Sequence, residues 1–198
     1  MIIERMAREL GLAEVFVQKL ARSASHEYKE YLIPKRTGGS RIIHHPSKRL
    51  KALQRWLLFN VVESLPVHEA ATAYRRNKSI LDNARPHAAS CYLLRMDFTN
   101  FFPSITQKDL KDYIGDRPDL FSNWNSADVE VFCQLVCRNS VLTIGSPTSP
   151  GLSNALCYEM DAKLQSLCAK SRVIYTRYAD DRAPRAQRAE EGPMCVTA

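Results

Sequence analysis

The sequence predicts an α+β fold, and three observations lead to that prediction. Two β-rich runs between residues 30 and 46 flank a Thr-Gly-Gly-Ser turn, which is typical of a β-hairpin. Two further apolar runs, at 91–97 and 173–181, each end in aspartate. Apolar residues recur at helical spacing over several of the remaining stretches. The chain therefore combines a hairpin, a second group of strands and several helices.

Helical periodicity covers much of the rest of the chain. Residues 2–22 predict two short helices that break near Gly11, and residues 48–65 predict an amphipathic helix that Pro66 ends. Each of these segments presents one apolar side, as a helix that packs on a core does. Later helices are expected at 106–114 with Thr106 as cap, at 126–138 with Ser126 as cap, and at 152–169.

Composition excludes several classes of protein. The 198 residues are 45% hydrophobic and 25% charged, which is typical of a globular chain and not of a disordered one. The apolar runs are too short to span a membrane, and the charged N-terminus lacks the apolar core of a secretory signal. We therefore expect a soluble, cytoplasmic protein with six buried, unpaired cysteines. Its net charge of +7 is compatible with a polyanionic partner.

The carboxylates at the ends of the strands are the strongest chemical signal. Asp97 ends one apolar strand, and Asp180 and Asp181 end another. Neighbouring carboxylates repel each other and burial adds to the cost, but a divalent cation removes that penalty. Mg²⁺ prefers oxygen ligands, and two such ions about 3.5–4 Å apart can activate an attacking hydroxyl and stabilise a leaving pyrophosphate. Asp97 alone would be read as a solvated residue at a strand end, and Asp180 and Asp181 alone could equally form a turn or cap a helix. Together they favour a metal site without establishing one.

Several short motifs, in order along the chain, resemble those of reverse transcriptases. Residues 178–181 (YADD) resemble the YxDD box of that family, and residues 95–104 (RMDFTNFFPS) resemble its first catalytic motif. Residues 145–150 (GSPTSP) resemble its G-x-P-x-S-P loop, and residues 33–43 resemble its fingers hairpin. Residues 83–87 (NARPH) match N-A-x-x-H, a mark of the retron branch. As an ordered series these motifs are specific, and the chain resembles a bacterial retron-type reverse transcriptase.

The resemblance implies a fingers–palm fold in which an antiparallel palm sheet carries helices on one face. It divides the chain into N-terminal helices (1–25), fingers (26–90), a palm (91–181) and an aberrant tail (182–198). The tail has few large apolar groups, so we expect no strand or helix there and a disordered segment. A second hairpin strand, a primer grip, a thumb and a V-T-G motif should follow the YxDD box. Arg182-Ala183-Pro184 stands there instead, so we expect a truncated or frame-shifted gene without a thumb.

By this resemblance, four residues form the metal site. The carboxylates of Asp97 and Asp180, with the carbonyl of Phe98, would hold two Mg²⁺ ions. Asp181 would be a weaker or transient ligand. The reaction implied is nucleotidyl transfer that extends DNA on an RNA template.

Four other residues would bind the incoming deoxynucleoside triphosphate. Lys35 and Arg41 are expected to face each other across the hairpin and hold the phosphates. Phe102 would lie under the deoxyribose and exclude a 2′-hydroxyl, whereas Phe101 is expected to pack in the core. Gly145 would let the backbone approach a base pair closely, because it has no Cβ.

The retron motif adds two candidate RNA-binding residues and one class of partner. Asn83 and His87 would contact RNA, although a role in satisfying loop backbone is equally open. The implied bacterial enzyme copies part of a structured noncoding RNA, holds the RNA–DNA duplex and is tied to antiphage defence. An effector protein or a second chain is a further possible partner, and no membrane is expected.

Two other readings of the sequence remain. A catalytically inactive fingers–palm fragment would at most bind RNA or a partner, and the aberrant tail favours it. A group II intron enzyme is a weaker alternative, because N-A-x-x-H and the compact N-terminus argue against it. Ile144 also departs from the glutamine that many relatives carry before the glycine of the loop, so nucleotide handling could differ.

Overall fold

The computed structural model describes residues 1–34 and 39–179, together with the backbone of residues 194–197. The chain forms two compact units. Unit 1 contains residues 1–65 and 102–153, and unit 2 contains residues 66–101 and 154–198. Each unit is therefore assembled from segments that are far apart in the sequence. No helix in the described part of the chain is both long enough and apolar enough to cross a bilayer.

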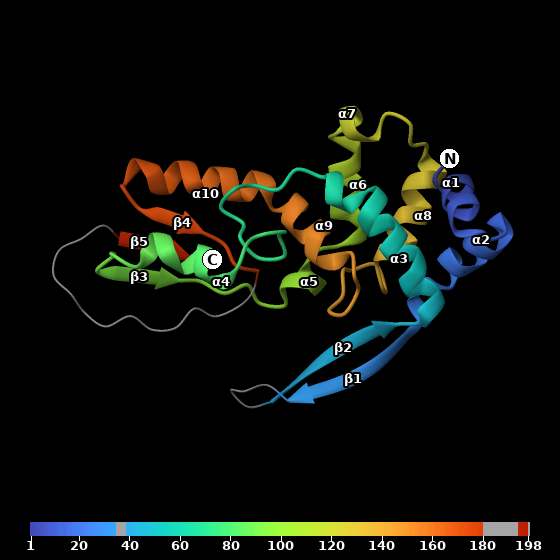
Figure 1. Ribbon diagram of the computed structural model, residues 1–198, viewed down its shortest axis with the longest axis horizontal. Helices are drawn as coiled ribbons and strands as arrows, with labels where there is room; N and C mark the ends of the chain where they lie inside the picture. Colours follow the sequence, from blue (N-terminus) through green and yellow to red (C-terminus); the bar gives the residue numbers. More distant parts are fainter. Residues whose placement is uncertain (35–38, 180–193, 198) are drawn as a thin grey trace. The chain divides into compact units, whose positions relative to one another are not determined.

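Unit 1 is built mainly of helices (Figure 1). Helices α1 (Ile2–Leu10) and α2 (Glu14–Arg22) pack together, and the chain breaks between them at Gly11, whose φ is 65°. A glycine in this left-handed conformation is the usual end of a helix, so the predicted break is confirmed. The short 3₁₀ turn η1 (Ala24–His26) leads into the hairpin. The later helices of the unit are α3 (Lys48–Asn60), α6 (Gln107–Gly115), α7 (Pro118–Phe121) and α8 (Ser126–Val136).

Helix α8 is the centre of the unit 1 core, because it packs against α1, α2, α3 and α6. The apolar side chains that these helices turn inward are fully buried, which supplies the main stabilisation of the unit; they include Met6, Val17, Leu50, Leu53, Leu57, Leu110, Phe132 and Leu135. The backbone N–H of Ile2 donates to Asp128 Oδ1 at 2.7 Å and ties α1 to the first turn of α8.

Two helix ends differ from the prediction. The cap of α8 is Asn125 and not Ser126, because the Asn125 side chain accepts from the Asp128 N–H at 2.9 Å in a capping box. Helix α3 ends at Asn60, before the predicted stop at Pro66, and the 3₁₀ turn η2 (Val62–Ser64) follows it. The predicted cap of α6, Thr106, is confirmed, with Thr106 Oγ1 accepting from the N–H of Asp109 at 3.3 Å.

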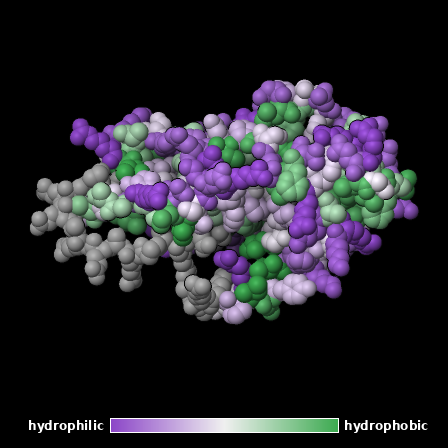
Figure 2. All heavy atoms as spheres, viewed as in Figure 1, coloured by the Kyte–Doolittle hydropathy of each residue, from purple (hydrophilic) through white to green (hydrophobic). Residues whose placement is uncertain are grey.

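The predicted hairpin is also confirmed. Strands β1 (Tyr28–Pro34) and β2 (Ser40–Pro46) pair antiparallel, with Leu32 opposite Ile42 and Ile33 opposite Arg41. Several apolar side chains of the hairpin are exposed, and Leu32 is 70% exposed. Figure 2 shows the resulting apolar patch over the hairpin. A patch of this kind on a protruding hairpin is typical of a surface that contacts a partner.

Unit 2 contains a three-stranded sheet with a long helix along one strand. Strands β3 (Tyr92–Arg95), β5 (Met194–Thr197) and β4 (Ile174–Thr176) lie in that order. Helix α10 (Tyr158–Lys170) runs beside β4 (Figure 1), and its Leu164 and Cys168 pack on a cluster that contains Val173 and Tyr175. The shorter helical segments are α4 (Ile80–Ala84) and the 3₁₀ turn η3 (Arg85–His87).

Two short helices contain the points where one unit ends and the other begins. These are α5 (Phe101–Ser104) and α9 (Ser149–Leu156). The single helix predicted at 152–169 is therefore two helices, since α9 ends at Leu156 and α10 begins at Tyr158. The apolar periodicity runs through both helices, so it did not reveal the break.

The prediction of an antiparallel palm sheet is wrong for the strands that the structure describes. β3 and β4 each pair with β5, and both pairings are parallel. A parallel pair needs a connection of roughly a dozen residues or more, and residues 177–193, which separate β4 from β5, are long enough for one. β5 also lies in the tail for which no strand was predicted. The division into fingers and palm stays a prediction.

Candidate active site

The carboxyl ends of β3 and β4 lie at the same edge of the unit 2 sheet. Both strands run parallel to β5, and Thr197 is in register with Arg95 on one side and with Thr176 on the other. Asp97 follows shortly after Arg95, and the chain beyond Thr176 leads to Asp180. Asp180 and Asp181 themselves lie outside the described residues. Parallel pairing with a common register thus directs both strands with predicted catalytic motifs to one edge.

Asp97 is an exposed carboxylate just beyond the end of β3. It has no hydrogen bond or ion pair with any other residue in the part of the chain that the structure describes. Phe98, the other predicted ligand that is described, is half-buried, and its ring lies 5.4 Å from that of Phe101. A carboxylate and a backbone carbonyl are the oxygen donors that Mg²⁺ takes, so this pair fits such an ion. Within residues 1–34, 39–179 and 194–197 no group of three potential metal ligands comes together.

A buried ion pair that the sequence reasoning missed anchors the end of β4. Arg177 and Asp161 are both fully buried; Arg177 Nη2 lies 2.8 Å from Asp161 Oδ2, and Arg177 Nε lies 2.9 Å from Oδ1. The Tyr175 hydroxyl donates to the same Oδ1 at 2.7 Å. Residues 175 and 177 share one face of the strand, so both reach Asp161 on α10. The sequence does contain a signal for this pair. Asp161 and Arg177 are charged residues at positions where the spacing of the apolar residues in the helix and in the strand predicts a core residue.

The ionisation of this cluster follows from its burial. Burial alone would lower the pKa of Arg177, but the hydrogen bonds and the charge of Asp161 raise it above its ordinary value. Burial, and then the bond to Asp161, raise the pKa of Tyr175. The guanidinium therefore stays charged and the phenol stays neutral at any physiological pH.

The backbone of Arg177 is held as firmly as its side chain. Its N–H donates to the carbonyl of Ala70 at 2.8 Å, and its carbonyl accepts from the N–H of Thr72 at 2.9 Å. Two residues further on, Ala179 is 2% exposed and has a φ of 49°. A non-glycine residue in this conformation costs about 1–3 kcal/mol and persists only where the surroundings impose it. The chain is therefore turned sharply at the residue directly before Asp180.

Asn83 and His87, the predicted RNA-binding residues, have protein partners in unit 2. Asn83 is 3% exposed, and its Oδ1 lies 3.2 Å from Thr72 Oγ1. His87 Nε2 lies 2.6 Å from Thr176 Oγ1, and burial lowers the pKa of His87. These contacts agree with the structural alternative left open by the sequence, and RNA contact stays a prediction.

The loop that contains Gly145 is bonded to strand β2 of the hairpin in unit 1. The His44 N–H donates to the Ile144 carbonyl at 2.8 Å, and His44 Nδ1 lies 2.5 Å from Thr143 Oγ1. Gly145 has a φ of 107°, and a Cβ there would lie 2.5 Å from the carbonyl oxygen of His44. Among the described residues the backbone at Gly145 lies close to the hairpin, and its predicted approach to a base pair stays a prediction.

The other predicted nucleotide-binding residues are placed only in part. Arg41 is exposed on β2, opposite Ile33, and Lys35 lies outside the described residues, so their predicted pairing stays a prediction. Phe101 and Phe102 are 5% and 6% exposed. A buried side chain could either pack in the core or exclude a 2′-hydroxyl. The core role of Phe101 and the sugar-selecting role of Phe102 therefore both stay predictions.

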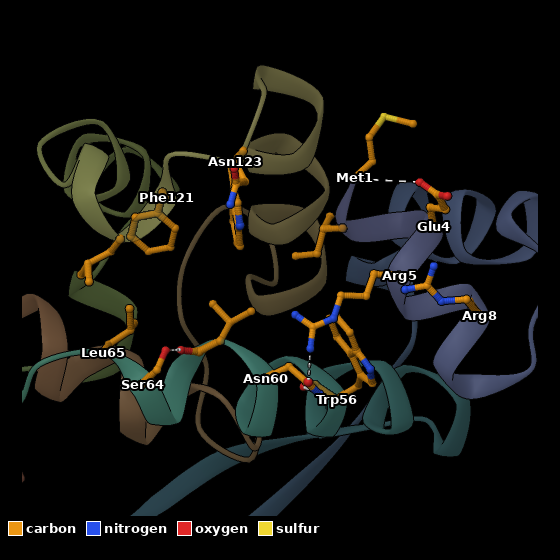
Figure 3. A pocket seen from close by; sticks show the side chains of 14 residues that line it. Met1, Glu4, Arg5, Arg8, Trp56, Asn60, Ser64, Leu65, Phe121 and Asn123 are labelled. Carbon is orange, nitrogen blue, oxygen red and sulfur yellow. Dashed lines mark hydrogen bonds and ion pairs between the residues drawn. The ribbon is translucent and has the colours of Figure 1, made fainter.

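Unit 1 also contains a cavity of about 520 Å³ between α1, α3 and the residues that follow α7 (Figure 3). Arg5 lies against the Trp56 ring, with its Cζ 5.3 Å from the ring centroid, and donates to Asn60 Oδ1 at 2.7 Å. Trp56 in turn donates to Glu9 Oε2 at 2.8 Å. None of the residues predicted for the active site lines this cavity.

Comparison with known proteins identifies the family. The profile of the family described as reverse transcriptase (RNA-dependent DNA polymerase) matches residues 33–196. The retron Ec83 reverse transcriptase of Escherichia coli is 40% identical over 81% of this chain and 53% of its own length. The retron Mx162 reverse transcriptase of Myxococcus xanthus is 36% identical over 98% of this chain and 45% of its own length. The retron Ec86 reverse transcriptase of Escherichia coli is 32% identical over 89% of this chain and 54% of its own length.

The chain thus spans about half the length of the curated relatives that it matches. The family match includes the end of β1, strand β2 and both strand-end motifs, and the similarity to several retron enzymes extends over most of the chain. The resemblance predicted from the motifs is confirmed: the chain belongs to the reverse transcriptase family of RNA-directed DNA polymerases and is similar to its retron members.

Proposed function

We propose that this chain carries the nucleotidyl-transfer centre of a retron-type RNA-directed DNA polymerase. The main support is the common sheet edge at which β3 and β4 end, because it serves both Asp97 and the strand that leads to Asp180. Two-metal chemistry needs several carboxylates close together, and strands that end at one edge of a sheet can supply them.

The proposed metal ligands are Asp97, Asp180 and Asp181, with the carbonyl of Phe98. Two Mg²⁺ ions held there would assist loss of the proton from the primer 3′-hydroxyl and offset the charge on the departing pyrophosphate. The chain itself must hold the carboxylates in place between turnovers. The ion pair of Arg177 with Asp161, and the backbone bonds of Arg177, supply that rigidity on the β4 side.

The incoming deoxynucleotide would be bound by Lys35 and Arg41 through its phosphates and selected by Phe102 through its sugar. Arg41 lies on the same strand as His44, which bonds to the Gly145 loop. The residues that bind the phosphates and this loop would therefore move together. The planar guanidinium of Arg41 suits phosphate oxygens, which it can bind at two points.

The proposed partners are a structured noncoding RNA that serves as template, deoxynucleoside triphosphates and the RNA–DNA duplex product. A role in antiphage defence is part of this proposal, and phage plating on cells with and without the intact gene would test it. The inactive fingers–palm fragment, which the composition of residues 182–198 suggests, remains the alternative.

Primer extension on an RNA template, with Mg²⁺ and deoxynucleotides, tests the proposal. The purified chain is compared with its Asp97→Asn and Asp180→Asn variants and with Asp119→Asn, a matched exposed carboxylate on α7. We expect extension by the wild type and by Asp119→Asn, and none by the other two variants. Absence of extension by every folded chain would support the inactive fragment.

A further inference from the structure

The two end residues of the retron motif both connect to the last residues of β4. Asn83 and His87 are four positions apart in the consecutive helical turns α4 and η3, so their side chains lie on one side. His87 reaches Thr176, and Asn83 reaches Thr72, which bonds to Arg177. The motif is therefore linked to two consecutive residues at the end of β4, to Thr176 directly and to Arg177 through Thr72.

The His87 contact is a short side-chain hydrogen bond. Nε2 lies 2.6 Å from Thr176 Oγ1, and Thr176 is 6% exposed. Nδ1 of the same ring is buried without a partner among the described residues. Because burial lowers the pKa of His87, the ring is neutral near pH 7 and carries one donor and one acceptor. With Nδ1 unpaired, Thr176 is the ring's hydrogen-bond partner in this part of the chain.

The Asn83 contact works through Thr72. Thr72 Oγ1 lies 3.2 Å from both Asn83 Oδ1 and the Arg177 carbonyl oxygen, although a hydroxyl has only one hydrogen to donate. The two ends of an amide are assigned from their hydrogen bonds, and turning the Asn83 amide by half a turn resolves the conflict. Asn83 Nδ2 then donates to Thr72 Oγ1, and Thr72 donates to Arg177.

These two hydrogen bonds, from Asn83 to Thr72 and from Thr72 to Arg177, fix the position of the Arg177 carbonyl. The carbonyl accepts from the Thr72 N–H at 2.9 Å as well as from the Thr72 hydroxyl, so both of its lone pairs are used. Asn83 and Thr72 are 3% and 4% exposed, so water cannot readily replace either partner. Arg177 is three positions before Asp180, and displacement of its carbonyl would redirect the chain that follows.

We propose that Asn83 and His87 are positioning residues that hold the end of β4 and so fix the direction in which the chain reaches Asp180. This role rests on the proposed polymerase function, but the contacts can be tested without it. The buried Asn83 side chain has little surface to offer RNA, whereas Arg85, between the two motif residues, is exposed. If this face binds RNA, Arg85 is the residue that would do so.

Hydrogen exchange tests the contacts directly. In Asn83→Ala, His87→Ala and Thr72→Val, we expect amide exchange at Thr72 and Arg177 to rise roughly fivefold or more, the factor that corresponds to one typical hydrogen bond. Arg85→Ala is the matched control and should leave both amides unchanged. Should Thr72→Val fail to fold, Thr72→Ser keeps the hydroxyl and should retain the wild-type exchange rates. Unchanged exchange in all the folded variants would overturn the proposal.

Activity and RNA affinity separate positioning from RNA contact. We expect Asn83→Ala and His87→Ala to lower the rate constant of nucleotide incorporation by on the order of 10²-fold, as small displacements at a catalytic centre do. The KM for the deoxynucleotide and the affinity for RNA should not change. Asn83→Asp should not rescue activity because it cannot donate to Thr72, whereas His87→Gln, which keeps an amide near Nε2, should rescue it in part.

Failure of the positioning proposal can be distinguished from failure of the proposed polymerase function. A loss of RNA affinity with unchanged exchange would make Asn83 and His87 RNA contacts and overturn the proposal. If even the wild type fails to extend a primer, the polymerase function proposed above fails, while the exchange rates still decide whether the motif holds β4.

Discussion

Arg177, the residue directly after β4, and Asp161 on α10 form a buried ion pair in which the guanidinium binds the carboxylate at two points, with Nη2 2.8 Å from Oδ2 and Nε 2.9 Å from Oδ1. Neither side chain is exposed to solvent. The pair fixes the last part of β4 to the helix beside it, directly before the residues of the YxDD box. Rigidity at this point is what a metal site at the sheet edge requires.

Removal of one partner of this pair should be strongly destabilising. Asp161→Ala leaves a buried, unpaired guanidinium, and we expect the free energy of unfolding to fall by about 3–5 kcal/mol. Urea titration followed by circular dichroism measures the change. In the double variant Asp161→Ala/Arg177→Met no buried charge remains, so much of the loss should be recovered. A single variant as stable as the wild type would show that the pair is solvated in solution.

Gly145 should not tolerate replacement by another residue, because a Cβ at this position would overlap the backbone of the hairpin. A Cβ at this residue would lie 2.5 Å from the His44 carbonyl oxygen, and the φ of 107° is unfavourable for any other residue. We expect Gly145→Ala to lower the free energy of unfolding by about 1–3 kcal/mol. Primer extension should fall with it if the loop and the hairpin act together.

Gly115 provides the matched control for that substitution. It ends α6, has nothing within 4 Å of the Cβ position and has no left-handed φ. Gly115→Ala should therefore change the free energy of unfolding by no more than about 0.5 kcal/mol. Equal effects of the two substitutions would mean that the contact between Gly145 and His44 does not form in solution.

Stability should fall at mildly acidic pH because of two histidines. Burial lowers the pKa of His87; burial and the charge of Arg138 lower that of His44, against the opposing effect of Glu30. Below the unfolded-state value of about 6.5, the unfolded chain binds protons more readily than the folded chain does. The contribution of both groups is thus complete above that pH and is lost as the pH falls toward their lowered values.

The measurement is the free energy of unfolding between about pH 5 and 7, the range in which histidine titrates. The double variant His44→Gln/His87→Gln should show a flatter pH dependence than the wild type over this range. His26→Gln is the control for removal of a histidine, since His26 lies outside both contacts. A slope that does not respond to the double variant would assign the pH dependence to other groups.

Two cysteines should be inert while the chain is folded. Cys133 and Cys137 are buried in unit 1, and burial raises the pKa of each thiol to about 12. Because the thiolate is the reactive form, alkylation at pH 8 should spare both. Cys91 and Cys168 are only half-buried and should react first. Mass spectrometry of peptides from native and urea-unfolded samples measures the difference, and rapid native labelling of Cys133 would contradict the packing of α8.

Local features were predictable because their causes are local. The break at Gly11, the Thr106 cap and the pairing of the two hairpin strands each depend on residues close in sequence, and all three are confirmed. The motifs also identified the family, since a motif is a string of neighbouring residues. The cap of α8 was misplaced by one residue because Asn125 and Ser126 are both good capping residues.

The direction of the unit 2 sheet and the contacts at its edge were not predictable in the same way. Strand pairing is decided between segments far apart in the chain, and the sequence motif implied a hairpin where the structure pairs β4 with β5 in parallel. Burial of Arg177 likewise depends on a partner on another element. A strand pattern records which faces are apolar, but it does not record which residue lies opposite a buried charge.

The family, the hairpin, most of the helices and the two aspartate motifs of this protein can all be read from its amino-acid sequence. Three features emerge only from the folded chain: the ends of β3 and β4 share one edge, the backbone at Gly145 lies against His44, and Asn83 and His87 are linked to the end of β4, Asn83 through Thr72. The physical reason is that propensity and periodicity act over a few neighbouring residues, whereas hydrogen bonds and ion pairs between distant segments exist only once the chain has folded.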